Sequence, residues 1–165
     1  MCRVLNKIIS ILGNVLCAIL SIVLIAFLLM QLFNYKIFVV TSGSMETTIK
    51  TGSIIIADCN VKGNDVEEND IVVFDNGTLI VHRAINVDKN RNKIETKGDA
   101  NTVSDGYIDF SQIKGKEKYS IPYLGYVFSF IKNNLITTLA LIISFFLLNM
   151  ILGIKENNKI AKNNF

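Results

Sequence analysis

Charged side chains are scarce in this chain: only 19% of its 165 residues are charged, and half are apolar. With a mean hydropathy of +0.41 it is too hydrophobic for an ordinary small soluble domain, and its composition excludes a disordered or collagen-like chain. Its three cysteines, Cys2, Cys17 and Cys59, offer no plausible intramolecular pair, which excludes a disulfide scaffold. The net charge is +3, and no run of Lys or Arg is interleaved with aromatic residues, so we expect no nucleic-acid partner.

The chain has two long apolar blocks instead. Residues 8–35 contain no charged side chain, and a second uncharged stretch covers residues 133–154. Each reaches the roughly 20 residues that a helix needs to cross the hydrocarbon of a bilayer. The alternative, two buried core helices, needs more surrounding protein than so short a chain provides. We therefore predict two transmembrane helices, at residues 8–35 and 133–154.

The first block also has to be compared with a cleaved signal peptide, because Arg3 and Lys7 resemble a basic leader region. The block is much longer than the roughly 7 to 15 apolar residues of a signal peptide, and no small-x-small cleavage pattern follows it. We therefore predict an uncleaved anchor.

The placement of charge predicts the topology. Residues 1–7 and residues 155–165 each carry a net charge of +2, whereas residues 36–132 carry −1. Short basic flanks remain on the cytoplasmic side of a membrane. We therefore expect a two-span protein of the cell membrane with both termini in the cytoplasm and residues 36–132 outside.

The segment between the two blocks has the pattern of a β domain with little helix. Short β-branched runs are separated by turn residues, and Asn76-Gly77 between two of them predicts a hairpin. The predicted strands cover residues 53–57, 70–74, 78–87 and 93–96, with weaker candidates at 39–41, 112–114 and 118–121.

Three elements of this domain could carry chemistry. His82 is the only histidine, Ser44 follows a glycine that leaves its hydroxyl accessible, and Asp99 and Asp105 are acids that could orient an imidazole. Taken one at a time, each has a simpler interpretation. A lone histidine on a strand is more often structural, and Ser-Gly and Gly-Asp are common turn sequences.

Taken together, and in this order, the motifs resemble type I signal peptidase. The match is to the endoplasmic-reticulum-type branch, in which a histidine replaces the general-base lysine of typical bacterial enzymes. The matching segments are Ser42-Gly43-Ser44-Met45-Glu46, Lys50-Thr51-Gly52-Ser53, residues 63–74, His82-Arg83, and Lys97-Gly98-Asp99-Ala100-Asn101 with Asp105.

The resemblance implies a role for each matching residue. Ser44 would be the nucleophile and His82 the general base. Asp105 is our first choice for the acid, with Asp99 as a second essential residue or the true partner. The backbone N–H of Ser44 and the hydroxyl of Ser42 would bind the oxyanion. Met45 would line the substrate pocket, and Arg83 would be structural.

The resemblance also implies a fold and an activity. The outer domain would be a mostly β, partly closed barrel between two transmembrane helices. It would be a serine endopeptidase that removes N-terminal signal peptides from secreted preproteins after a small-x-small site. Its partners would be those signal peptides, the lipid bilayer and the protein translocation machinery. No metal or organic cofactor is implied, because no Cys/His/carboxylate cluster has ligand spacing.

One departure and two alternatives remain open at this point. Thr47 stands where the family usually has a proline, which keeps a catalytically inactive membrane-anchored scaffold in consideration. In a second alternative, Cys59, His82 and Arg83 would form a transpeptidase site as in sortases. The chain order counts against that alternative, since sortases have their cysteine after the histidine.

Overall fold

A computed structural model of the chain describes the backbone of residues 2–163 and the side chains of residues 8, 11–148, 150, 151, 153 and 154. It divides into two compact units, one of Met1–Leu29 with Ile131–Phe165 and one of Met30–Phe130, here called the β unit. The terminal side chains on which the predicted topology depends, residues 1–7 and 155–165, lie outside the described ones.

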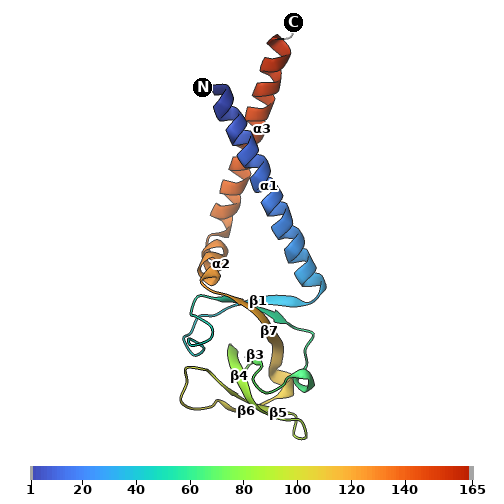
Figure 1. The fold of residues 1–165 in the computed structure, drawn as a ribbon, viewed down its shortest axis with the longest axis vertical. Helices are drawn as coiled ribbons and strands as arrows, with labels where there is room; N and C mark the ends of the chain where they lie inside the picture. The colour runs from blue at the N-terminus through green and yellow to red at the C-terminus, as the bar shows by residue number, and fades with distance from the viewer. Residues whose placement is uncertain (1, 164–165) are drawn as a thin grey trace. The chain divides into compact units, whose positions relative to one another are not determined.

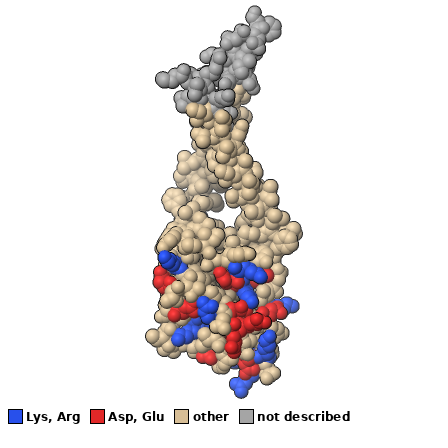
Figure 2. All heavy atoms as spheres, viewed as in Figure 1, with Lys and Arg blue, Asp and Glu red and all other residues tan. Residues whose placement is uncertain are grey.

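The first unit contains the long helix α3 (Leu135–Asn163) and all but the last three residues of the long helix α1 (Cys2–Leu32) (Figure 1). Within the described part of the chain, only Ile11–Leu32 of α1 is by itself long and apolar enough to span a membrane, with a mean hydropathy of 2.8. An apolar N-terminal helix is therefore confirmed. In the view of Figure 2, the described atoms of both long helices carry no charged side chain, and the charges gather on the β unit.

The second predicted span remains a prediction. The helix α2 (Leu124–Asn133) and the segment Leu135–Leu148 pass the same test only together, as a broken pair. The helix α1 also ends earlier than expected, at Leu32. Asn34 adopts a left-handed φ of 56°, and the chain has already entered a strand by Tyr35.

The β unit is built on one sheet of seven antiparallel strands, in the order β1-β2-β7-β3-β4-β5-β6 (Figure 1). The strands are β1 Tyr35–Val39, β2 Ile54–Asp58, β3 Ile71–Asp75, β4 Leu79–Asp88, β5 Lys93–Lys97, β6 Gly106–Asp109 and β7 Ile113–Ile121. The mostly β prediction is confirmed. The sheet ends on β1 and β6 and is not closed, so the expected barrel closure is not found.

The four strongest strand predictions match β2, β3, β4 and β5, each within one residue at either end. The predicted hairpin joins β3 to β4, and Gly77 takes the positive φ of 82° that this turn requires. The prediction missed β6 and α2. It also began the first strand at residue 39, where β1 in fact ends.

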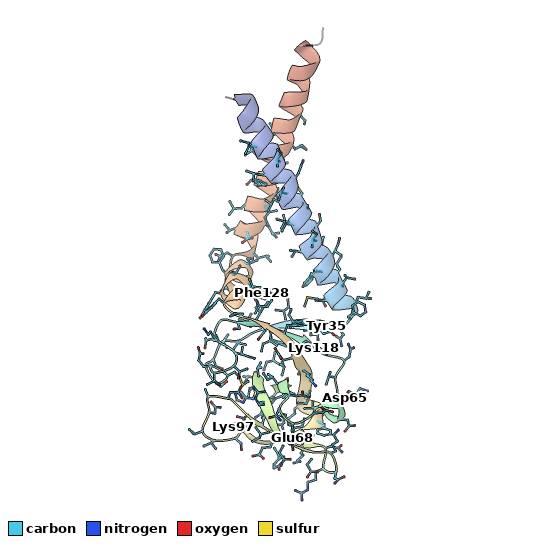
Figure 3. All side chains as sticks on the ribbon, viewed as in Figure 1. Tyr35, Asp65, Glu68, Lys97, Lys118 and Phe128 are labelled. Atoms are coloured by element: carbon cyan, nitrogen blue, oxygen red, sulfur yellow. The ribbon has the colours of Figure 1, made fainter. Side chains whose placement is uncertain are left out.

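Alternation along β3 divides the core between the two faces of the sheet. Val72 and Phe74 belong to one buried cluster, whereas Val73 belongs to the other. The second cluster also contains Val40 and Met45, which flank the segment that carries Ser44. Figure 3 shows Tyr35 and Phe128 at one end of the β unit and Glu68 toward the other.

Candidate active site

The strand β4 carries the only histidine and the arginine beside it. Successive residues of a strand point to opposite faces, so His82 and Arg83 project to different sides of the sheet. His82 is 6% exposed, and its ring lies 6.2 Å from that of Phe74. The imidazole is therefore held within the packed side of the sheet rather than displayed on its surface.

His82 is oriented by a carboxylate. Its Nδ1 lies 2.5 Å from Oδ2 of Asp105, and the same oxygen accepts a hydrogen bond of 2.8 Å from the Thr96 hydroxyl. The backbone N–H of Asp105 also donates to the Thr96 carbonyl at 2.8 Å. A carboxylate only accepts hydrogen bonds, so this contact favours a proton on Nδ1 and leaves Nε2 as an acceptor.

Arg83 makes a forked ion pair with the other candidate acid. Its Nε and Nη2 donate to the two carboxylate oxygens of Asp99 at 2.8 and 2.7 Å, and the Thr48 hydroxyl donates to the same carboxylate at 2.5 Å. These hydrogen bonds, Arg83 first, hold the pKa of Asp99 below its ordinary value, against an opposing effect of burial. The same pairing raises the pKa of Arg83. Asp99 thus ties its loop to Arg83 of β4.

Ser44 lies on an exposed turn that we call the serine loop, residues 41–51 between β1 and β2. Its backbone carbonyl accepts the N–H of Ala100 at 2.8 Å. A side-chain carbon built at Gly98 would lie 2.6 Å from that carbonyl and 2.9 Å from Nε2 of His82. The free imidazole nitrogen and the backbone of Ser44 therefore meet at the same glycine, and any larger residue there would push them apart.

The hydroxyls of Ser42 and Ser44 lie together, 3.2 Å apart. Ser42 is exposed and Ser44 is partly buried, so both can be reached from solvent. Side-chain hydroxyls are among the donors from which an oxyanion hole can be built.

Met45, expected in a substrate pocket, is 1% exposed and packs in the second core cluster with Val40 and Ile49. Its sulfur accepts the backbone N–H of Asp99 at 3.4 Å. Met45 therefore links the serine loop to the segment that carries Asp99. Its contact with substrate stays a prediction.

Sequence reasoning missed Thr48 and Thr96, the two hydroxyls that bond the candidate acids. Neither stands out in the sequence, because a single threonine next to a turn or in a strand has no distinguishing pattern. Only their hydrogen bonds to Asp99 and Asp105 in the folded protein reveal the two threonines.

The Cys/His/Arg alternative is poorly supported by the geometry. Burial raises the pKa of the Cys59 thiol, which is the opposite of what activates a cysteine nucleophile. Arg83 is already engaged by Asp99. Among the described side chains, no three of His, Cys, Asp and Glu gather into a group that could hold a metal ion.

Comparison with known proteins gives the class. Residues 12–120 match the family described as "Signal peptidase, peptidase S26", so the chain belongs to that family. It is also similar to the protein named Signal peptidase I W of Bacillus subtilis (strain 168), with 32% identity over 77 residues. That match covers 44% of this chain and 40% of the Bacillus protein.

Proposed function

We propose that this protein is a membrane-anchored serine endopeptidase that removes N-terminal signal peptides from secreted preproteins after a small-x-small site. We further propose that it uses the serine–histidine arrangement of the endoplasmic-reticulum-type branch. The observation that carries the proposal is the contact of His82 Nδ1 with Asp105, with Nε2 of the same ring beside the backbone of Ser44 at Gly98.

The proposed reaction follows from these contacts. His82 Nε2 takes the proton of the Ser44 hydroxyl as its oxygen attacks the scissile carbonyl, and the imidazolium then gives that proton to the leaving amine. Water repeats the sequence on the acyl-enzyme, which releases the signal peptide and restores Ser44. The N–H of Ser44 and the hydroxyl of Ser42 would stabilise the negative oxygen of each tetrahedral intermediate.

Of the two acids, we propose Asp105 for the triad and Asp99 as a positioning residue. The hydrogen bond of Asp105 to Nδ1 supports the first role, since an acceptor there fixes the tautomer and stabilises the imidazolium. The fork between Arg83 and Asp99 supports the second, because Arg83 engages both oxygens of Asp99.

We propose two membrane spans, cytoplasmic termini and an extracytoplasmic β unit, with the bilayer, signal peptides and the translocation machinery as partners. The apolar segment Ile11–Leu32 supports anchoring, and β1 begins three residues after it. Ser44 follows β1 by five residues, which keeps the proposed nucleophile close in sequence to the anchor. Such an enzyme would meet membrane-held preproteins by diffusion in two dimensions.

The direct test is cleavage of a preprotein with a small-x-small site by the full-length protein in membranes. Ser44→Ala should lower the rate by at least about a thousandfold, because it removes the attacking oxygen. The matched control is Ser111→Ala, which changes an exposed serine of the same unit and should cleave like wild type. Full activity of Ser44→Ala would overturn the proposal.

A second outcome separates catalysis from scaffolding. If the folded wild-type protein cleaves none of several preproteins, an inactive scaffold or a dedicated substrate is favoured. Thr47→Pro, which restores the residue that the family usually has there, then shows whether a loosened turn is the cause.

A further inference from the structure

The serine loop is closed at its base. The N–H of Gly52 donates to the Val40 carbonyl at 2.9 Å, and the N–H of Val40 donates to the Ser53 carbonyl at 2.9 Å. Both ends of the loop are thus fastened to each other by backbone hydrogen bonds. The position of Ser44 depends on whatever holds this base in place.

The first turn of α2 packs against that base. The N–H of Gly125 donates to the Gly52 carbonyl at 2.9 Å, and a side-chain carbon on Gly125 would lie only 2.7 Å from the same oxygen. The ring of Tyr126 lies so close to Gly52 that a side chain there would overlap it. Gly52 also has a positive φ of 81°. Both this backbone conformation and the lack of space beside Tyr126 therefore favour glycine at this position.

Two side-chain contacts add to the packing. Lys50 Nζ donates to the Tyr123 hydroxyl at 3.1 Å, and that hydrogen bond raises the pKa of Lys50. The Tyr126 hydroxyl reaches the Thr51 carbonyl at 3.5 Å. Every residue from Lys50 to Gly52 therefore contacts the segment 123–126.

The contacts continue from the base toward the nucleophile. The N–H and the hydroxyl of Thr51 donate to the Glu46 carboxylate at 3.2 and 2.7 Å, and they hold the pKa of that carboxyl below its ordinary value. Glu46 is two residues beyond Ser44. The proline that usually stiffens this turn in the family is Thr47 here, so the loop depends on such contacts.

We infer that residues 123–126, the start of α2 and the residue before it, position Ser44 for attack, with Tyr126 as the principal positioning residue. The inference rests on the proposed function and extends it, because it makes the segment that follows the sheet part of the catalytic apparatus. A displacement of about 1 Å at a reacting atom can cost about a hundredfold in rate. Loss of the Tyr126 ring would leave the loop base free to shift by such an amount.

The test compares Tyr126→Ala, Tyr126→Leu and Tyr126→Phe in the full-length, membrane-embedded protein, with the preprotein described above as substrate. The matched control is Tyr119→Ala, which removes a tyrosine that is 69% exposed on β7. We expect Tyr126→Ala to lower kcat about 10- to 100-fold with KM within about twofold, because nucleophile placement affects the reacting geometry more than substrate binding. Tyr126→Phe keeps the ring and should retain activity within about threefold.

Two further readouts distinguish positioning from general damage. The acid limb of the pH profile of kcat should keep its midpoint in Tyr126→Leu, since His82 and Asp105 are untouched. If Tyr126→Ala fails to fold, Tyr126→Leu replaces it in the test, because leucine keeps apolar volume but lacks the ring. We then expect a lowered kcat in Tyr126→Leu. Wild-type kcat in a folded Ala or Leu variant, or a loss equal to that of Tyr119→Ala, would overturn the inference. Wild-type cleavage that does not require Ser44 would instead overturn the proposed function.

Discussion

At the scale of single residues, two neighbours on one strand hold two acids of the same loop. His82 contacts Asp105, and Arg83 contacts Asp99. Successive residues of a strand point to opposite faces, so His82 and Arg83 leave β4 on different faces. Each acid therefore has a different partner, although the sequence places the two acids only six residues apart.

A comparison of single-residue variants tests this division. Asp105→Asn should lower kcat by about 10³- to 10⁴-fold, because an amide favours the wrong tautomer of His82. Asp99→Asn leaves the imidazole contact intact and should cost much less in kcat. Steady-state cleavage rates of both variants, each checked for folding, measure the difference. Equal losses would contradict the assignment.

At the scale of elements, the segment from Gly98 to Asp105 connects β5 to β6 and contacts both His82 and Arg83 of β4. It is fastened near one end by the fork between Arg83 and Asp99 and at the other end by the hydrogen bond between Thr96 and Asp105. The serine loop joins it through the Ala100 hydrogen bond to Ser44. Three segments distant in the chain are thus held in one geometry by a few charged and polar contacts.

The pH dependence of stability reports on this fastening. The folded pKa of Asp99 lies below its ordinary value of 3.8, so its contribution is complete above that value and is lost as the pH falls through the folded pKa. At pH 7 we expect Asp99→Asn to lower the free energy of unfolding by about 1 to 2 kcal/mol. The gap between wild type and variant, from denaturant unfolding in detergent, should narrow below about pH 4. A gap that widens there would contradict the expected sign.

At the scale of the whole molecule, the chain enters and leaves the β unit on strands that share a neighbour. The strand β1 follows α1, β7 precedes α2, and both pair with β2. The chain enters β1 at Tyr35, opposite Asp58, and leaves β7 at Ile121, opposite Ile54, so the two connections lie at opposite ends of β2.

Thiol labelling tests the proposed two-span topology. In a cysteine-free background, Ser111→Cys on the β unit should react with a membrane-impermeant reagent on intact cells. Asn157→Cys in the tail should react only after the cells are permeabilised, because the basic flanks are expected inside. Labelling of Asn157→Cys in intact cells would show that the tail lies outside the cell. The predicted second span would then be absent or the whole predicted orientation reversed.

Much of this structure follows from local pattern. The long apolar run determined the helix α1, β-branched runs between turn residues determined β2 to β5, and Asn76-Gly77 determined the hairpin. The strand β6 escaped because it has four residues and begins with Gly106, and a run that short carries too little periodicity to be recognised. The helix α2 escaped because almost all of it lies in residues 36–132, which were interpreted as a β domain, and its ten residues are a short stretch for recognising helical periodicity.

The sequence by itself determined the apolar N-terminal helix, the β-rich class and the candidate site residues, because hydropathy, periodicity and motif are properties of neighbouring residues. Only the tertiary structure decided which acid meets His82, that Met45 is a core residue, and that α2 supports the serine loop. These depend on strand register and on contacts between residues tens of positions apart. No local pattern records such distances, since they are set when the sheet and its loops pack together.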